Sequence, residues 1–501
     1  MQNLIPYRQR QFAKGMNDKL EPNIIPDGTA QIAKNVVLRN NRIEKRTGYT
    51  VIADDLGAYK ILGLAPYKLN NGTSYLVMCV NDTVSSSALY YWTGSGNWTA
   101  VTSGGSLTVD LDMNFAQANN RLYCFNGTDA VRRIDTITAS SIGAIPVGKF
   151  GLWFHNRMWV AGVSSARNRL YYSNVNDPET WGGSDFIDIE LNDGDMITGL
   201  GVMQDELIVF KERQTWGVTG FGAASFTVEL LIPGYGSVNH RSIVKAGNEL
   251  LFLSFDGTTP HVRSLKITSF GTLVYGGIVS DAMEGTMSTL ANTQLSKACA
   301  IVSNNFYRLS VTDSGSSNND QELVLDVMND GWTYNTGINA SCYAISDVSG
   351  TYTVYFGESR ADSKVYKFDT SNSDNGTAIS MQYRTKKIEV GAPERKKRFK
   401  YLYVQAKATG DYDINIDHSS DGYNFNDTGT FDLDTSGSEW GTMVWGTGTW
   451  GAPDRLTKRF EIAASHTGYY LQLDFLHAVA DQPITIYSYE LMYRLKGLRE
   501  A

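Results

Sequence analysis

The residues that could perform acid–base, nucleophilic or metal chemistry are scattered along this 501-residue chain. Its six histidines stand alone, without the H-x-H or H-E-x-x-H spacing that brings two imidazoles to one metal ion. The sequence also lacks a phosphate-binding P-loop and the G-x-S-x-G elbow of serine hydrolases. We therefore predict no catalytic residues, no metal ion and no cofactor, and a protein that is not an enzyme.

Acidic residues are the next candidates for chemistry. Residues 192–195 (NDGD) and 329–331 (NDG) place oxygen ligands beside a glycine, as calcium loops do, but neither has the terminal glutamate of an EF-hand. We therefore favour a plain turn at both places, with a calcium loop as the alternative. Asp411, Asp413 and Asp417 alternate along a predicted strand, so they would share one face of a sheet. Such a face suits a pair of glycosidase carboxylates, and simple solvation explains it equally well.

One dense basic block stands out at residues 394–400 (ERKKRFK). Its members Arg395, Lys396, Lys397 and Arg398 could contact DNA phosphates or an acidic neighbouring protein. The alternative is a solvated loop between two strands. We mark these four residues as a candidate interface.

Three tryptophans, each followed by glycine, recur every five residues at Trp440, Trp445 and Trp450. An odd spacing would send successive side chains to opposite faces of one straight strand, so a glycine-rich loop or a bulged edge is more natural. Exposed tryptophans in such a loop would anchor a partner, while core packing is the alternative. These residues complete the candidate interface.

The bulk properties narrow the class of protein. The four cysteines lie far apart without a C-x-x-C pair, which predicts buried free thiols and no metal site. A net charge of −8 argues against strong non-specific attraction of the whole molecule to DNA or to an anionic membrane. We find no signal-peptide core and no apolar run long enough for a membrane helix, so we expect a protein made in the cytoplasm.

A repeated unit fills the middle of the chain. Asn or Asp, a polar residue and a run of apolar and aromatic residues recur, for example at 120–125 (NRLYCF), 156–160 (NRMWV) and 248–253 (NELLFL). A turn former followed by β-formers, repeated over some three hundred residues, is typical of a β-propeller. The uneven repeat lengths leave the number of blades open between six and eight.

The whole chain is therefore predicted to be all-β, in three parts. Residues 1–60 form an irregular N-terminal arm, with a single helical turn possible at 30–35 and a hairpin turn at Asn40–Asn41. Residues 61–377 form the β-propeller platform. The polar stretch 369–377 is the best linker. Residues 378–501 alternate apolar and polar side chains, which predicts a β-sandwich or jelly-roll domain.

These patterns together resemble a family. The segments 27–39 (DGTAQIAKNVVLR) and 42–49 (RIEKRTGY) are similar to the opening of phage tail proteins. The segments 169–181, 199–210, 215–220 and 418–425 resemble the tail nozzle, or packaged-DNA stabilisation, proteins of short-tailed bacteriophages. The resemblance lies in texture and order over most of the chain and brings no catalytic residues with it.

The resemblance implies a homohexameric ring in the virion tail, assembled in the host cytoplasm. The ring would extend the DNA channel below the portal–adaptor complex and help to retain the packaged genome until ejection. Its partners would be the portal and adaptor, tail fibre, spike or needle proteins, and genomic DNA that passes without sequence-specific binding, with no membrane insertion. The alternative is a carbohydrate-binding or glycoside-hydrolysing propeller with a β-sandwich module, in which Trp, Tyr and acidic residues would bind sugars.

Overall fold

The computed structural model describes residues 4–191, 193–268, 271–368, 371–410, 412–421, 424–434, 455–462 and 467–497. Strands dominate, and the described helices are short: η1 (Arg39–Asn41), η2 (His240–Ser242), η3 (Asp281–Met283), α1 (Glu284–Ser288) and η4 (Asn292–Lys297). Within these residues, no helix has both the length and the apolar character needed to cross a bilayer. The chain divides into two compact units, a propeller unit (50–322 and 338–368) and a sandwich unit (1–49, 323–337 and 369–501).

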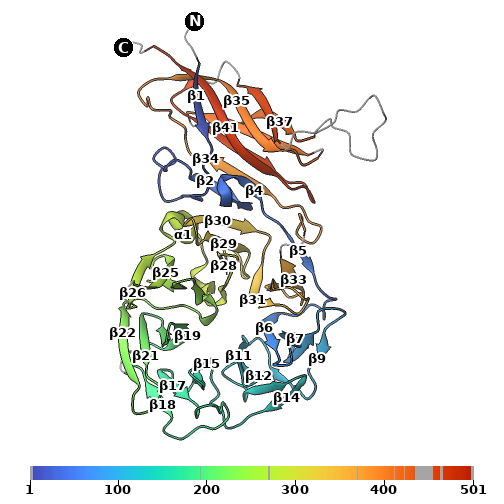
Figure 1. Ribbon diagram of the computed structural model, residues 1–501, viewed down its shortest axis with the longest axis vertical. Coiled ribbons are helices and arrows are strands. Elements are labelled where there is room, and N and C mark those ends of the chain that lie inside the picture. Colours follow the sequence, from blue (N-terminus) through green and yellow to red (C-terminus); the bar gives the residue numbers. More distant parts are fainter. Residues whose placement is uncertain are drawn as a thin grey trace. The chain divides into compact units, whose positions relative to one another are not determined.

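The propeller unit confirms the predicted β-propeller (Figure 1). Six sheets, each of four or five antiparallel strands, form its complete blades. The blades in chain order are β6 (Ile61–Lys68), β7 (Ser74–Asn81), β8 (Ser86–Trp92), β9 (Thr99–Ala100) and β10 (Leu107–Thr108); β11 (Asn114–Ala118), β12 (Arg121–Phe125), β13 (Arg132–Asp135) and β14 (Thr138–Ser141); β15 (Phe150–Phe154), β16 (Arg157–Ala161), β17 (Arg169–Tyr172) and β18 (Phe186–Asp188); β19 (Ile197–Met203), β20 (Glu206–Lys211), β21 (Gln214–Thr219) and β22 (Thr227–Pro233); β23 (Val244–Ala246), β24 (Glu249–Phe255), β25 (Pro260–Ile267) and β26 (Leu273–Ile278); and β31 (Ala340–Ser346), β32 (Thr353–Glu358) and β33 (Val365–Phe368) with β5 (Tyr49–Val51).

A further meander stands between the fifth and sixth blades. It contains β27 (Cys299–Ser303), β28 (Phe306–Val311) and the first residues of β29 (Gln321–Asp326). Its first strand contacts β23 on one side and β31 on the other. The innermost strands of the unit therefore follow one another around a common axis, and β31 closes the circle against β6.

Hairpin turns explain the repeated Asn-containing motif. Asn119 and Asn120 both have positive φ (46° and 64°) between β11 and β12, and Asn304 and Asn305 (50° and 61°) do the same between β27 and β28. Two consecutive left-handed residues make the two-residue turn whose twist matches that of paired strands, and Asn tolerates this backbone best after glycine. The motif thus marks the turn between the first two strands of a blade.

Neighbouring blades are held together by apolar faces. The first blade packs Leu76, Met78 and Trp92 against Tyr355 and Val365 of the last blade in one buried cluster. All four cysteines are buried and free, which confirms that prediction. The N-terminal strand β5 supplies the outer strand of the last sheet, and the amide of Ile52 donates to the carbonyl of Val365 at 3.1 Å. The start of the propeller sequence is therefore fastened to its end.

The sandwich unit contains two sheets. One has the order β3-β4-β41-β35-β38, with β1 paired to β41 and β39 to β35, and the other has the order β30-β2-β34-β40-β36-β37. Their strands are β1 (Ile5–Gln9), β2 (Ala30–Lys34), β3 (Val36–Val37), β4 (Ile43–Lys45), β30 (Gly331–Thr336), β34 (Met381–Thr385), β35 (Lys397–Lys407), β36 (Asp413–Ser420), β37 (Asn426–Asp432), β38 (Arg455–Glu461), β39 (Thr467–Gly468), β40 (Leu471–His477) and β41 (Thr485–Leu495).

Aromatic rings fill the space between these two sheets. Phe475 from one sheet and Tyr489 from the other lie 5.9 Å apart between ring centroids. Phe12 meets both Tyr383 (5.8 Å, edge to face) and Tyr489 (6.1 Å). Phe12 precedes β2 in the chain and is fully buried, so the N-terminal segment supplies part of the core.

The domain limits therefore differ from those expected from the sequence. Residues 1–49 are not an independent arm, because β1 pairs along β41 and β2 pairs along β34. The segment 30–35 forms the strand β2 rather than a helical turn, since its backbone groups are used by this pairing. The turn at Asn40–Asn41 is confirmed: both residues have positive φ, and β3 pairs with β4 across them.

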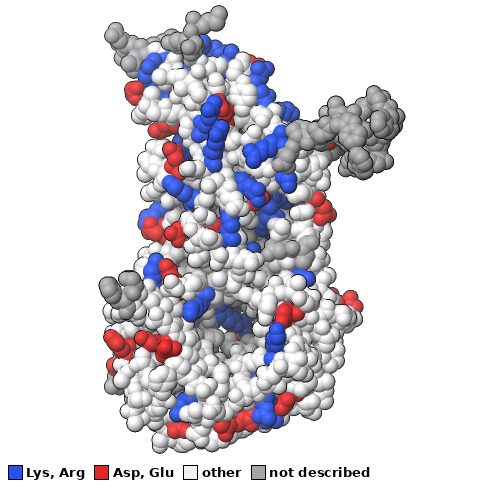
Figure 2. Space-filling model, viewed as in Figure 1, with Lys and Arg blue, Asp and Glu red and all other residues white. Residues whose placement is uncertain are grey.

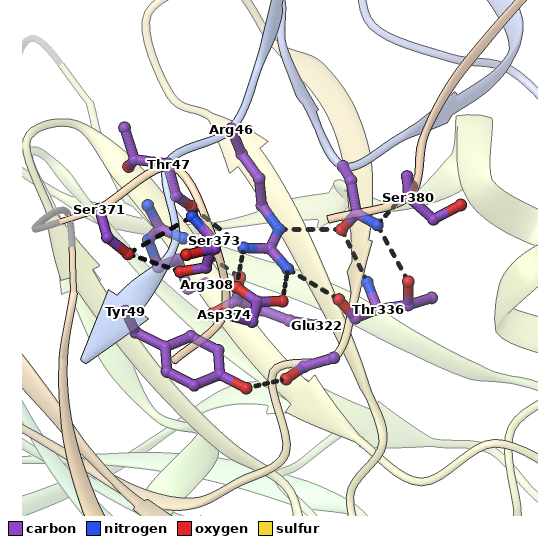
Figure 3. A network of polar contacts seen from close by, with 12 residues as sticks. Arg46, Thr47, Tyr49, Arg308, Glu322, Thr336, Ser371, Ser373, Asp374 and Ser380 are labelled. Carbon is purple, nitrogen blue, oxygen red and sulfur yellow. Dashed lines mark hydrogen bonds and ion pairs between the residues drawn. The ribbon is translucent and has the colours of Figure 1, made fainter. Parts of the chain in front are cut away.

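A buried ion pair joins the three chain segments of the sandwich unit (Figure 3). Arg46 donates through both terminal nitrogens to Asp374, at 2.8 and 2.6 Å, and the two side chains are only 4% and 7% exposed. The same guanidinium donates to the Thr336 carbonyl and to the Asn35 side chain. Asp374 lies in the stretch 369–377, which the sequence predicted to be a linker. The described part of this stretch is therefore anchored by the ion pair.

Candidate functional site

The clearest concave feature of the propeller unit is a cavity on its axis. It has a volume of about 420 Å³ and is lined from nearly every blade, among others by Leu64, Phe115, Leu152, Val202, Ile243 and Tyr343. A second cavity of about 130 Å³ has more charged and polar residues in its lining, among them Lys60, Asp110, Asp112, Lys297, Asn319 and Ser359. Figure 2 shows a hollow in the propeller with basic side chains on its wall. The axis of a propeller is the usual place for a binding site, so the residues between these cavities are the first candidates.

Arg241 is the residue that both cavities share. It comes from the short helix η2, between the fourth and fifth blades. Its Nη1 donates to the Asp112 carboxylate (3.1 Å) and to the Ser341 carbonyl (3.4 Å). Its Nη2 donates to the carbonyls of Met113 (3.1 Å) and Leu62. One guanidinium thus joins the first, second and last blades and contributes to the lining of both cavities.

Charge and burial explain why Arg241 stays in place. Burial acts to lower the pKa of Arg241, but charge interactions, that with Asp112 first, leave the pKa raised. The planar fork of arginine can donate to several oxygens at once, which a lysine cannot do. At any ordinary pH the axis therefore contains a fixed positive charge that is already bonded to protein oxygens.

His240 precedes Arg241 in the same helix and faces the axial cavity. Its Nδ1 accepts a hydrogen bond from the Leu200 amide at 3.2 Å, and its ring lies 5.0 Å from that of Phe150. Burial first, and then the neighbouring Arg241, lower the pKa of His240 to about 4. The imidazole is neutral at physiological pH and has a structural hydrogen bond.

The described residues of the two segments weighed as calcium loops, 193–195 and 329–331, lie in or beside turns, and protein donors bind Asp193 and Asp195. Asp193 pairs with the buried Lys211 at 2.6 Å, and Asp195 accepts the amides of Glu212 (3.0 Å) and Arg213 (2.9 Å). Asp330 has a positive φ of 52°, as expected of a turn residue. Among the residues that the structure describes, no group of three or more His, Cys, Asp or Glu side chains could hold a metal ion.

The predicted acidic face is present only in part. Asp413 and Asp417 lie on β36 at alternating positions, and Asp411 lies outside the described residues. Asp417 is directly opposite Asp474 of β40. Asp474 in turn accepts from Arg384 at 2.6 Å and from Gln382 at 2.8 Å. The structure therefore brings a second carboxylate beside Asp417, and an arginine already binds it.

The predicted basic block lies at the start of β35, and its four residues do not share one environment. Lys397 is fully buried, and its ammonium donates to the carbonyls of Tyr469 (2.8 Å) and Ala392. The prediction that Lys397 belongs to an interface is therefore wrong, because its side chain is buried inside the sandwich unit. Lys396 is exposed, whereas Arg395 is half-buried and donates to the Lys496 carbonyl. Arg398 is half-buried on β35. Trp440, Trp445 and Trp450 lie outside the described residues.

A different charged surface of the sandwich unit is larger than the predicted block. The outer face of the sheet containing β35 carries a row that crosses four strands, Arg8 on β1, Glu490 on β41, Tyr403 on β35 and Arg459 on β38. We name the basic–tyrosine face by its residues, which are Arg8, Lys400, Tyr401, Tyr403, Lys407, Arg455 and Arg459. Figure 2 shows Lys and Arg side chains gathered over this unit.

The sequence contained a signal for this face that is easy to miss. In β35 the residues Leu402, Val404 and Ala406 are fully buried, so Tyr401, Tyr403, Gln405 and Lys407 point to the other side. Only the pairing with β38 adds Arg455 and Arg459, about fifty residues further along the chain. Alternation predicted the outward residues of each strand, but not which strands lie side by side.

Comparisons with known proteins bear on the fold alone. No protein-family model matches the sequence, and no curated protein matches it. Among solved structures, the Neurospora crassa Pan2 WD40 domain matches with a TM-score of 0.37 and 8% identity, over 63% of this chain and 97% of that one. Apo AztD from Citrobacter koseri matches with a TM-score of 0.34 and 9% identity, over 58% and 80%. The exo-beta-1,3-galactanase of Phanerochaete chrysosporium, solved with galactose, has a TM-score of 0.28 and 9% identity, over 78% and 98%. Identities this low say nothing about activity.

Proposed function

We propose that the chain is a structural subunit of the tail nozzle or hub of a short-tailed phage. In this proposal several copies, six by the resemblance, form a ring below the portal–adaptor complex. The ring extends the DNA channel and helps to retain the packaged genome until ejection. The portal, the adaptor and the tail fibre, spike or needle proteins are its neighbours, and the location is the virion tail.

The position of Arg241 between the two cavities is the observation that supports this proposal most directly. The space between the axial cavity and the second cavity is occupied by a guanidinium that is bonded to the first, second and last blades. Such a propeller suits a platform whose outer surfaces make contacts rather than a cup that opens to a ligand. The DNA channel of the proposed ring would accordingly lie between copies and not along the axis of one propeller.

The distribution of charge supports the same function. The propeller unit contains 20 Lys and Arg against 28 Asp and Glu, while the sandwich unit contains 24 of each. The whole excess of negative charge therefore belongs to the propeller. A negative wall repels DNA phosphates, which lets a duplex slide without sticking.

The mass of the purified protein tests the proposal, alone and with the portal–adaptor complex of its phage, together with negative-stain images. We expect ring-shaped particles of about six copies that dock on the adaptor. A protein that stays monomeric and never docks would contradict the proposal. A glycan panel then separates the alternative, because a sugar-active protein would bind or hydrolyse a member of the panel and lose this with Asp413→Asn.

A further inference from the structure

One end of the third and fourth blades carries an exposed aromatic ring among carboxylates. Phe221 is 71% exposed, and its ring stacks on His155 at 4.7 Å. The same histidine lies 3.8 Å from Asp205, whose side chain is 91% exposed. An apolar ring that is held in place while facing water is a common form of partner anchor.

Two glutamates lie near this end of the fourth blade, on the face of its sheet that turns towards the fifth blade. The carboxylate of Glu206 lies over Gly217, and Gly217 pairs with Glu229 on the outer strand β22. Partial burial, and then the charge of Glu229, raise the pKa of Glu206. We name Asp205, Glu206, Phe221 and Glu229 the acidic rim. Its like charges repel one another, so a cationic partner would relieve an unfavourable interaction.

The basic–tyrosine face of the sandwich unit has an excess of positive charge, opposite in sign to the charge of the acidic rim. Among the residues that the structure describes, it presents five cations, Arg8, Lys400, Lys407, Arg455 and Arg459, and the carboxylates paired beside them are Glu461 and Glu490. Glu490 is already paired with Arg8 at 2.6 Å. The exposed side chains of Arg455 and Arg459 lie on β38, the last strand of the sheet order.

We propose that the basic–tyrosine face of one copy docks on the acidic rim of a second copy of this chain. The inference rests on the proposed ring and names the surfaces through which it forms. Two different patches meet, so the contact is head-to-tail, the type of interface that generates a closed ring when the rotation between copies closes. Charge complementarity selects the partner: each surface has the charge that the other lacks, and each offers aromatic rings.

The tyrosines favour a protein partner over a nucleic acid. Bases bind such sheets by stacking on exposed aromatic rings. The Tyr401 ring instead has Lys400 over it at 4.8 Å and Arg459 at 5.0 Å, and the Tyr487 ring has Arg455 at 4.4 Å. These rings hold cations in position, which suits recognition of fixed carboxylates.

Charge reversal with rescue tests the contact. The variants are Arg455→Glu/Arg459→Glu on one surface, Asp205→Lys/Glu229→Lys on the other, and all four changes combined. Lys14→Glu and Glu212→Lys are control variants, since both residues are exposed and lie outside the two surfaces, and Glu212 follows the end of β20 that is away from Asp205. The mass distribution is measured against concentration, alone and on the portal–adaptor complex. We expect each double reversal to raise the assembly midpoint at least about tenfold, and the combined variant to recover most of the loss.

Three results would overturn the inference in distinguishable ways. If the wild type assembles and the two double reversals assemble like the controls, the surfaces are wrong while the ring proposal stands. If Arg455→Glu/Arg459→Glu abolishes binding of a labelled single-stranded DNA without changing assembly, the face takes nucleic acid instead. If the wild type assembles neither alone nor on the adaptor, the inference fails together with the proposed function.

Discussion

Arg46, which is buried, and Arg241, which is mostly enclosed, show how differently the two units use the same side chain. In the sandwich unit, Arg46 forms a bidentate ion pair with a carboxylate that is itself only 7% exposed. In the propeller unit, Arg241 donates mainly to backbone carbonyls, and its one carboxylate partner, Asp112, is 56% exposed. The first arginine neutralises a buried charge, whereas the second satisfies neutral oxygens beside cavities that water can enter. Replacing these two arginines should therefore reduce the free energy of unfolding by different amounts.

The largest effect is expected at Arg46. Arg46→Met leaves the Asp374 carboxylate buried without its cation, which should reduce the free energy of unfolding by about 3–5 kcal/mol. A urea titration of the purified variant measures this. The matched variant Arg46→Met/Asp374→Leu removes both charges and should regain most of the loss, because paired apolar groups tolerate burial. A loss below about 1 kcal/mol in the single variant would show that the pair contributes little.

The second effect concerns pH and the neighbour of Arg241. The pKa of His240 is about 4 in the folded protein and ordinary in the unfolded chain, so the unfolded state binds more protons between pH 4 and 6.5. Stability contributed by the neutral ring is thus full above pH 6.5 and falls as pH decreases towards 4, by up to about 3 kcal/mol. His240→Asn keeps an acceptor for the Leu200 amide but does not titrate. The difference between the two urea–pH profiles should become constant above pH 7 and change between pH 6.5 and 4, and parallel profiles throughout would contradict this account.

These sites also show what the sequence could predict. Alternation and turn residues predicted the propeller, the sandwich strands and the hairpin turns, because local backbone preference and one-sided burial decide them. Three features needed contacts between residues hundreds of positions apart: the N-terminal strands within the sandwich, the anchoring of Asp374 by Arg46, and Arg241 on the axis. No local pattern marks Arg241, whose neighbours in the chain are His240 and Ser242.

The third effect is expected at Arg241. Arg241→Met leaves the carbonyls of Leu62, Met113 and Ser341 without this donor, but water in the adjoining cavities can replace it in part. We expect a loss of about 1–2 kcal/mol, smaller than at Arg46. Arg241→Lys should lie between the wild type and Arg241→Met, because one ammonium cannot reach all four oxygens. A loss equal to that of Arg46→Met would remove the distinction between the two regions.

The smallest effects sharpen the comparison within the basic block. Lys397 resembles Arg241 in that its buried ammonium donates to backbone carbonyls, whereas the adjacent Lys396 is exposed, with its ammonium 5.4 Å from the Tyr469 ring. Lys397→Met should cost about 1 kcal/mol, since two lost hydrogen bonds are partly offset by the removal of a buried charge. Lys396→Met should change the free energy of unfolding by less than about 0.5 kcal/mol. Thermal and urea unfolding of the two variants in parallel distinguish them. Equal costs would mean that burial does not separate these neighbours, and a cost at Lys397 as large as at Arg46 would mean that a carbonyl-bound cation weighs as much as a buried ion pair.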